Sequence, residues 1–453
     1  MTGEVEAYAP PPVHHGFWSR LARGISICWL PVLVAWYISA TTTGGTVVPW
    51  RPNMVDLEVY RRTASVLLVG DNFYELPGPL PFLYPPFAAI LAVPLALLPI
   101  AVVELGWTAA CAGALVAILH RFRLKGWVLS LASSALIYIV QPVVQTLVFG
   151  QLGIFLVALV VLDLAPGPRV FSRRMLPEGA LTAVATAIKL TPAIFVVYLL
   201  VVRNFRAFWV AVATGTFLTL LGFAILPTES YEFWTRLAHG DTGLGPEIIY
   251  YTNQSVMADI MRIFGAGRGP AIAGLVLSAV VVLAGVGAAM LWQRLGDVLL
   301  AINLCGVAGL LASPVSWLHH FVWVVPLAAS LLEQRPISPR RLPVWYLAVG
   351  WLLVGWLVVA PFTELPHGEH VGPELQWTLS QHVLASITAL LGLVLLVGAI
   401  LIARPRVLPV FARPRRKALG LGRRSEAAES FGGSQLAVDS VTTQRPADRL
   451  AGP

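Results

Sequence analysis

The sequence predicts an all-α membrane protein that crosses the bilayer about twelve times and carries short helices in its external loops. Of its 453 residues, 57% are hydrophobic and only 12% are charged, whereas soluble domains have roughly 25% charged residues. A water-soluble fold of this length could not bury so much apolar surface. Apolar runs such as 181–202, 271–291 and 383–403 approach the ~20 residues that a transmembrane helix needs.

Twelve apolar runs define the predicted transmembrane helices. They lie near residues 25–41, 84–98, 101–119, 127–141, 146–164, 180–202, 206–226, 271–291, 297–312, 317–333, 343–361 and 383–403. An even number of crossings places both termini on the same side of the membrane. The polar segments 42–83, 227–270 and 362–382 then lie together on the other side, where loops on a rigid scaffold commonly carry functional residues.

The chain is expected to have three parts. Residues 1–24 are predicted to be a disordered cytoplasmic N-terminus, 25–403 the transmembrane domain, and 404–453 a basic and then disordered cytoplasmic tail. The formal net charge of +8 comes from 404–424, which holds eight Arg or Lys residues and no acid. A basic cluster directly after the last helix is typical of an anchor to anionic membrane lipid, so nucleic acid is not an expected partner.

Basic residues orient the predicted helices, because cytoplasmic loops carry an excess of Lys and Arg. In the second half of the chain, Arg203, Arg206 and Arg294 fall on the side of the termini, as this rule requires. In the first half, the basic loops 121–125 and 169–174 would face outward. Either these cations serve an external anion, or the number of helices predicted there is wrong.

The first external segment contains a candidate catalytic acid, Asp56, in the run DLEVYRR, which closely precedes the sequence FLYPPF at 82–87. On a short helix Asp56 and Tyr60 would share one face, whereas Glu58 would point elsewhere. An acid beside the membrane surface is well placed to take a proton from a sugar hydroxyl. The alternative is an ordinary solvated loop helix with an acid and two arginines.

A single lysine, Lys189, lies inside the apolar run 180–202, in the sequence IKLTP. Leaving its charge in lipid costs at least ~2.5–3.5 kcal/mol unless the charge is paired or faces a polar cavity. A buried cation of this kind can hold a phosphate. The alternative is a lysine that snorkels to the membrane surface or pairs with Glu104.

Two adjacent histidines end the sequence SPVSWLHH at 313–320. Neighbours on a helix point ~100° apart, so one of His319 and His320 should face any given cavity. His320 is the preferred residue, because it lies one turn after Ser316. No cysteine or carboxylate accompanies the pair, and a zinc pair would more naturally be spaced i, i+4, so no metal site is predicted. An interfacial belt of Trp and His is the alternative.

Two further motifs place amides where they could hydrogen-bond to a polyol. They are GQLG at 150–153 and NQS at 253–255. Turn or helix-cap roles are the alternative for both.

Taken in chain order, these motifs resemble the C-type membrane glycosyltransferases that use polyprenyl-phosphate mannose, specifically the actinobacterial group in glycosyltransferase family 87. The resemblance covers about residues 25–403. It rests on an acid in the first external loop, Asp56, followed in order by FLYPPF, GQLG, IKLTP, NQS and SPVSWLHH. Each element is weak alone, and the ordered set carries the resemblance.

The resemblance implies a GT-C fold and transfer of mannose from a polyprenyl-phosphate mannose donor to a glycolipid acceptor, such as a phosphatidylinositol mannoside, with inversion to an alpha-1,2 linkage. The reaction would take place on the outer side of the cytoplasmic (inner) membrane. Two other functions stay open: transfer of another polyprenyl-phosphate sugar, such as arabinofuranose, and transport of a lipid-linked sugar without chemistry.

The resemblance also implies roles for single residues. The family's catalytic acid maps onto Asp56 and its later histidine onto His320, with His319 beside it leaving that choice open. His320, His319 and Lys189 are the expected contacts to the donor phosphate. The expected substrate contacts are Tyr60, Arg61, Tyr84, Gln151, Asn253, Gln254 and Trp317. No cofactor or metal is expected, because a lipid phosphate leaves as a stable anion and needs one base and a few cations.

Overall fold

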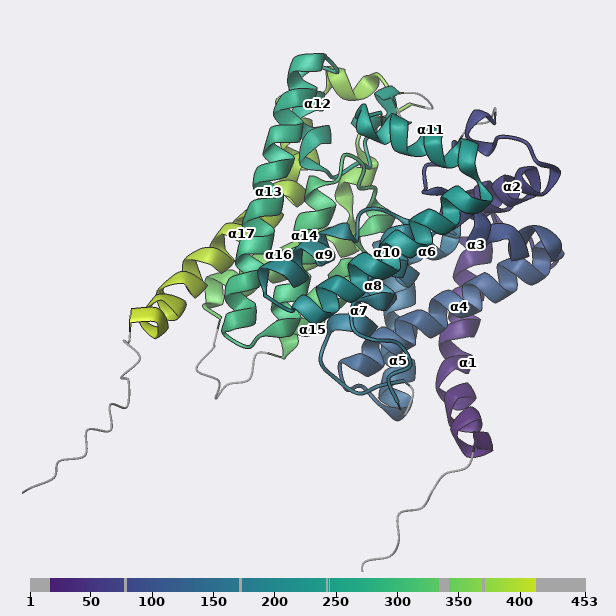
Figure 1. The fold of residues 1–453 in the computed structure, drawn as a ribbon, viewed down its shortest axis with the longest axis horizontal. Helices are drawn as coiled ribbons and strands as arrows, with labels where there is room; N and C mark the ends of the chain where they lie inside the picture. The colour runs from purple at the N-terminus through teal and green to yellow at the C-terminus, as the bar shows by residue number, and fades with distance from the viewer. Residues whose placement is uncertain are drawn as a thin grey trace, which may run out of the picture. The chain divides into compact units, whose positions relative to one another are not determined.

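The computed structural model describes residues 17–76, 80–170, 173–241, 243, 245–333, 342–368 and 371–412. Within these residues the fold is all-helical, as predicted, and its only β-type pairings are two isolated bridges (Figure 1). Contacts group residues 1–410 into one unit and 411–453 into another. Residues 1–16 and 413–453, which hold most of the two predicted disordered tails, lie outside the described residues.

The elements of the first half are α1 (Phe17–Thr41), α2 (Val55–Val69), η1 (Phe73–Glu75), α3 (Pro86–Leu97), α4 (Ile100–Arg121), α5 (Gly126–Ile139), α6 (Gln141–Phe149), α7 (Gly153–Leu164), α8 (Ala180–Ile188), α9 (Ala193–Val201) and α10 (Phe205–Ile225). Here α marks an α-helix and η a short 3-10 helix. The first helix therefore begins inside the segment that the sequence predicts to be disordered.

The elements of the second half are α11 (Pro227–Ala238), η2 (Gly245–Ile249), α12 (Val256–Phe264), α13 (Arg268–Arg294), α14 (Val298–Ala312), η3 (Leu318–Trp323), α15 (Val324–Leu332), α16 (Val344–Val359), η4 (Pro361–Glu364), η5 (Pro373–Gln376) and α17 (Leu379–Ala412). Each predicted transmembrane run is helical over most of its length.

Several helices are long and apolar enough to cross a membrane. Among the described residues these are five, namely α1, α4, α10, α13 and α17, or six if α5 and α6, which meet at an 80° bend, form one span. The other apolar helices are shorter, at 10–17 residues. The chain is therefore a multi-pass membrane protein, and the described residues do not confirm the predicted number of twelve spans.

Two predicted spans are broken inside the membrane domain. The run 146–164 is divided between α6 and α7, because Gly150 takes the left-handed conformation (φ 69°) that ends a helix. The run 180–202 is divided between α8 and α9, where Lys189 is extended (φ −147°) and Pro192 caps the start of α9. Proline disfavours a helical conformation in the residue before it, so IKLTP itself contains a signal for this break.

The α8–α9 pair returns to the side from which it starts. Asn204, just after α9, donates a hydrogen bond of 3.0 Å to Glu178, just before α8. Each helix has nine residues, a rise of ~13.5 Å, which is less than half of the ~30 Å hydrocarbon core. The prediction of one continuous helix over 180–202 is therefore wrong. The segment is a helical hairpin with Lys189 at its tip.

The basic loops of the first half lie at the end of the fold where α1 begins. Trp36, near the end of α1, donates a hydrogen bond of 3.0 Å to the carbonyl oxygen of Leu105, near the start of α4. The two helices therefore run antiparallel. Arg121, at the far end of α4, donates a hydrogen bond of 2.7 Å to the carbonyl oxygen of Ala165, which brings the two basic loops together. The structure thus puts both loops at the end of the fold where α1 begins, whereas the predicted topology put them at the opposite end.

The position of α3 explains this difference. Arg61 of α2 donates hydrogen bonds to the carbonyl oxygens of Leu95 (3.2 Å) and Leu98 (3.3 Å) at the far end of α3. Because the far end of α3 is held beside α2, the run 84–98 does not carry the chain to the opposite end of the fold. The chain reaches that end along α4, which brings Arg121 to the end where α1 begins.

The three polar segments that were expected on one side do lie at one end of the fold, where Figure 1 shows α2, α11 and α12. Asn72, after α2, donates a hydrogen bond of 2.8 Å to Glu232 of α11. The rings of Tyr251 and His367 stack with their centroids 3.8 Å apart. These contacts link 42–83 to 227–270 and 227–270 to 362–382.

Small residues let the membrane helices pack closely around α14. A Cβ atom on Gly285 of α13 would lie 2.1 Å from the Cβ of Ala308 on α14, and one on Gly306 would lie 2.5 Å from the Trp323 ring. Glycine at these positions allows backbones to approach each other in a way that lipid-embedded interfaces favour. The packed α14 leads directly into the segment 313–320.

Candidate active site

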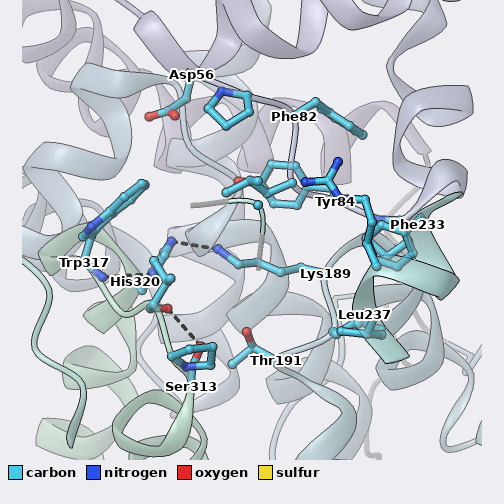
Figure 2. Close-up of a pocket in the computed structure, with 18 of the residues that line it drawn as sticks. Asp56, Phe82, Tyr84, Lys189, Thr191, Phe233, Leu237, Ser313, Trp317 and His320 are labelled. Atoms are coloured by element: carbon cyan, nitrogen blue, oxygen red, sulfur yellow. Dashed lines mark hydrogen bonds between the residues drawn. The ribbon is translucent and has the colours of Figure 1, made fainter. Parts of the chain in front are cut away.

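A cavity of about 400 Å³ lies where α2, the tip of the α8–α9 hairpin, α11 and the segment 313–320 meet (Figure 2). Seven of the predicted site residues line it, namely Asp56, Tyr60, Tyr84, Gln151, Lys189, Trp317 and His320. Four do not, namely Arg61, Asn253, Gln254 and His319. Residues that are far apart in the sequence therefore meet at one site.

Asp56 lies in the first turn of α2, and Figure 2 shows it on the cavity wall near Trp317 and Phe82. Its side chain is half-buried and that of Tyr60 is buried, whereas Glu58 between them is exposed. This is the division of faces that helical spacing predicts. Glu58 is absent from the cavity wall, so Asp56 is the carboxylate that α2 presents to the site.

The surroundings of Asp56 make it a stronger base than a solvated aspartate. Burial raises the pKa of its carboxyl group from 3.8 to about 6. A hydrogen bond with Gln151 and the positive charge of Lys189 act in the opposite direction and offset only part of this effect. Asp56 is therefore ionised at neutral pH and accepts a proton more readily than an exposed carboxylate does.

Lys189 reaches the cavity because the hairpin breaks at that residue. Its Nζ lies 2.7 Å from Nε2 of His320 and 5.4 Å from the centre of the Tyr84 ring. Among the described residues, no carboxylate forms an ion pair with it. The alternative partner Glu104 instead accepts a hydrogen bond of 3.2 Å from Trp50. The charge of Lys189 thus faces the cavity and forms no direct ion pair there.

His320 is oriented by the backbone of its own 3-10 turn. Its Nδ1 accepts a hydrogen bond of 3.2 Å from the backbone N–H of Trp317, which leaves the ring hydrogen of a neutral imidazole on Nε2. Its Nε2 forms one hydrogen bond with Nζ of Lys189, 2.7 Å away (Figure 2). The two side chains thus meet at one point of the cavity, where an anion that contacts both could replace this hydrogen bond.

His319 faces away from the cavity. It is buried, its ring packs edge-on against Phe149 with centroids 5.7 Å apart, and it is absent from the cavity wall. The two histidine rings are nearly perpendicular, at 84°, because they are successive residues of a 3-10 helix. The expected contact of His319 with the donor phosphate therefore has no support in this geometry.

Asn253 is a structural clamp, although an amide contact to substrate was expected there. Its Nδ2 donates to the carbonyl oxygens of Ile248 (2.8 Å) and Pro314 (2.9 Å). Its Oδ1 accepts from the backbone N–H groups of Ser255 (3.2 Å) and Ser316 (2.9 Å). With its hydrogen-bonding capacity filled by backbone, Asn253 fixes the position of the segment that carries His320.

Gln254 and Arg61 also bind protein groups instead of facing the cavity. Gln254 is buried, donates to the carbonyl oxygen of Tyr251 (3.4 Å) and accepts from Thr388 (2.6 Å). Arg61 holds the end of α3. Their expected roles as substrate contacts are corrected to roles in positioning the loops and α3.

The cavity also has lining residues that sequence reasoning missed, among them Thr191, Phe233, Arg236 and Asp241. Arg236 forms ion pairs with Asp241 (3.2 Å) and Glu232 (3.5 Å). Thr191 belongs to the motif IKLTP, and the only signal for the other three was their place in the external segment 227–270. An arginine with nearby acids on an amphipathic helix is too common to indicate a site.

The arrangement suits a displacement in which a phosphate ester is the leaving group. A carboxylate on one wall can take a proton, and two side chains that meet on another can hold a phosphate oxygen. Within the described part of the chain, no three His, Cys, Asp or Glu side chains are grouped to hold a metal ion. Asp56, Lys189 and His320 are the cavity residues that fit these two roles.

Comparisons with curated proteins found relatives over most of the chain. One from Mycolicibacterium smegmatis, named polyprenol-phosphate-mannose-dependent alpha-(1-2)-phosphatidylinositol mannoside mannosyltransferase, is 30% identical over 375 residues, covering 74% of this chain and 83% of the relative. A protein of the same name from Mycobacterium tuberculosis is 30% identical over 345 residues, covering 68% of this chain and 76% of the relative.

A second relative from Mycolicibacterium smegmatis, named polyprenol-phosphate-mannose-dependent alpha-(1-2)-phosphatidylinositol pentamannoside mannosyltransferase, is 33% identical over 359 residues, covering 75% of this chain and 82% of the relative. No solved structure matches the chain. The family model that matches, over residues 82–314, is that of glycosyltransferase family 87. The chain therefore belongs to glycosyltransferase family 87.

Proposed function

We propose that this protein transfers mannose from polyprenyl-phosphate mannose to a phosphatidylinositol mannoside or a related glycolipid, with inversion to an alpha-1,2 linkage. Membership of the family and the names of its relatives support this reaction. The observation that carries the proposal is the cavity in which Asp56 faces Lys189 and His320.

The reaction is a single displacement. Asp56 accepts the proton of the acceptor hydroxyl, whose oxygen attacks the anomeric carbon of mannose. The bond from that carbon to the phosphate oxygen breaks, and polyprenyl phosphate leaves with the electron pair. One displacement turns a β-linked donor into an α-linked product, and the leaving phosphate needs no general acid because its oxygen is stable as an anion.

Lys189 and His320 hold the phosphate in this mechanism. Nζ of Lys189 and Nε2 of His320 lie 2.7 Å apart, so one phosphate group can contact both side chains, and the phosphate gains negative charge as the sugar leaves. Donors fixed where charge develops stabilise the transition state more than the ground state, which is the condition for catalysis. Trp317, whose ring lies 6.0 Å from that of His320 in a stacked arrangement, forms the adjoining wall.

The site is placed on the outer side of the cytoplasmic membrane. In this topology, α3 and the α8–α9 hairpin do not cross, and α1, α4, α5–α6, α7, α10, α13, α14, η3–α15, α16 and α17 do. This gives an even number of crossings, fewer than the twelve predicted, with both termini in the cytoplasm. Support comes from Arg121, Arg203 and Arg294, which then all lie on the cytoplasmic side.

The proposal is tested by incubating purified protein with polyprenyl-phosphate mannose and short phosphatidylinositol mannosides. The mass and the linkage of the product are then measured. Asp56→Asn should lower turnover by roughly 10²–10⁴-fold, the usual worth of general acid–base catalysis. Glu58→Gln on the exposed face of α2 is the matched control and should be tolerated.

Three outcomes would refute the proposal. If activity survives Asp56→Asn but is lost in Glu58→Gln, the assignment of Asp56 as the base is wrong. Transfer only from polyprenyl-phosphate arabinofuranose would change the donor. Movement of the donor across vesicle membranes, with no glycolipid product, would identify a carrier instead of an enzyme.

A further inference from the structure

A row of aromatic side chains runs along the cavity wall from α2 to α11. Successive ring centroids lie 5.5 Å apart between Tyr60 and Tyr84, 5.3 Å between Tyr84 and Phe82, 6.1 Å between Phe82 and Tyr74, and 6.0 Å between Tyr74 and Phe233. All of these residues line the cavity, and Figure 2 shows Phe82 and Tyr84 between Asp56 and Phe233. The row therefore leads from the proposed base to α11.

The tyrosine hydroxyls of this row bind protein groups. The hydroxyls of Tyr60 and Tyr84 lie 3.1 Å apart, and Tyr60 donates a hydrogen bond of 3.1 Å to Gln151. Tyr74 donates a hydrogen bond of 2.6 Å to the carbonyl oxygen of Tyr84. These bonds fix the rings in place, so a ligand in the cavity meets ring surfaces more than hydroxyl groups.

A cluster of charged side chains ends the row on α11. Arg236 lies one turn after Phe233, so the two share a face of the helix, and both line the cavity. Nε of Arg236 donates to Asp241 at 3.2 Å and Nη1 donates to Glu232 at 3.5 Å, while Asn72 donates to Glu232 at 2.8 Å. Within the described residues, these bonds use two of the five N–H groups of the guanidinium and leave the others for a ligand.

The charges of this cluster favour a neutral ligand with hydroxyl groups. One cation stands beside two carboxylates, so the cluster as a whole does not attract a phosphate. A hydroxyl suits it, because a hydroxyl can donate to a carboxylate and accept from a guanidinium. A pyranose ring also has a face of C–H groups that packs on the negative face of an aromatic ring. Aromatic rings followed by an Arg–Asp pair thus form a surface for a chain of sugars.

We propose that this aromatic row and the Arg236–Asp241 pair are the subsite for the acceptor glycan. The inference rests on the proposed function, in which the attacking hydroxyl lies at Asp56. The sugars that precede the attacking one then extend along the rings toward α11, and the one that reaches Arg236 and Asp241 is held by hydrogen bonds.

Other parts of the cavity wall suit the donor. Its phosphate would contact Lys189 and His320 in the proposed mechanism. Its isoprenoid chain needs an apolar surface, which the membrane helices α9 and α13 supply through Ile194 and Val282. The wall that carries both aromatic rings and charged groups is therefore left for the acceptor.

Mono-, di- and trisaccharides of α-linked mannose test the subsite as inhibitors that compete with the acceptor, because they carry neither lipid nor phosphate. In the wild-type protein the inhibition constant should fall with each added sugar. Arg236→Lys keeps the charge of the ion pairs but loses the planar fork of N–H groups. It should raise the inhibition constant of the trisaccharide about tenfold and leave that of mannose unchanged.

Phe233→Leu removes the last ring of the row and should weaken the trisaccharide about three- to tenfold. Tyr231→Leu is the matched control, because Tyr231 is on the same helix, is 71% exposed and lies outside the cavity wall. It should leave every inhibition constant in place. The KM of the donor should stay unchanged in all three variants, and thermal unfolding in detergent checks that each is folded.

The outcomes separate this inference from the proposed function. A trisaccharide that binds wild-type protein no better than mannose refutes the subsite. Unchanged inhibition constants in Arg236→Lys and Phe233→Leu also refute it and leave the ion pairs with a structural role. A raised donor KM in place of a weaker trisaccharide would assign the α11 wall to the donor. In these cases mannose transfer by the wild-type protein still stands. If that protein forms no glycolipid product, the proposed function fails, and the inference falls with it.

Discussion

Replacing Gly150 by alanine tests how closely α6 must approach α2. The new Cβ would lie 2.5 Å from the Cβ of Leu57 and 3.3 Å from both the Leu57 backbone nitrogen and the Cβ of Met54. Ordinary contacts between such atoms begin near ~3.4 Å, where dispersion is favourable. The two helix ends must therefore separate by about 1 Å at Leu57, the residue that follows Asp56.

Two terms make up the expected effect on stability. Gly150 has φ 69°, and an alanine in this region costs about 1–2 kcal/mol. The forced separation of packed helices adds about 1–3 kcal/mol. Activity should fall more steeply than stability, because a displacement of about 1 Å at a reacting group can cost about 10²-fold in rate.

Gly70→Ala separates these two terms. Gly70 ends α2 with φ 85°, also left-handed, but a Cβ there meets nothing within 4 Å. It should lower the unfolding temperature only by the conformational term and leave turnover unchanged. Thermal unfolding in detergent and initial rates with saturating lipids measure both effects. If Gly150→Ala keeps wild-type turnover, the contact between the two helix ends does not control the base.

Lys189→Met should slow transfer most at limiting donor, because the side chain no longer attracts the lipid phosphate; wild-type rates at limiting donor would contradict the phosphate role. His320→Ala should reduce activity far more than His319→Ala, since only His320 lines the cavity; equal losses would assign both rings to structure. Turnover should fall as the pH drops below about 6, the pKa to which burial raises the Asp56 carboxyl; a limb centred near 4 would refute this. Because that pKa lies above its unfolded value, ionisation of Asp56 destabilises the folded protein. This cost grows as the pH rises from about 4 to about 6 and is complete above about pH 6. Asp56→Asn should thus raise the unfolding temperature at pH 7 but not at pH 3.5, as measured by calorimetry.

The apolar runs could be predicted as helices because composition over ~20 residues is a strong signal. Whether a run crosses the membrane could not be predicted from composition. The run 84–98 is as apolar as 101–119, yet its far end is held beside α2 by Arg61. No local pattern contains that contact. The positive-inside rule did indicate that the predicted topology was inconsistent, because it conflicted with the positions of the basic loops 121–125 and 169–174.

The sequence identified best those residues whose charge is energetically unfavourable at their position in the chain. Asp56 and Lys189 stood out because an acid at a membrane entry and a cation in an apolar run need an explanation. Asn253 and Gln254 were misassigned because an amide that can bind a polyol can equally bind backbone groups. Arg236 was missed because paired charges on an amphipathic helix are ordinary.

The distance between base and phosphate site depends on amides that bind protein groups. Gln151 ties the end of α6 to Tyr60 of α2, and Asn253 ties its own loop to Pro314 and Ser316. A displacement needs the attacking oxygen, the anomeric carbon and the leaving oxygen in line, so the walls of the cavity must hold their spacing without help from the substrate. Gln151 lies at the cavity wall with α2, whereas Asn253 lies outside it and holds the segment that carries His320. Loosening either contact should therefore lower turnover while leaving the fold of the membrane helices intact.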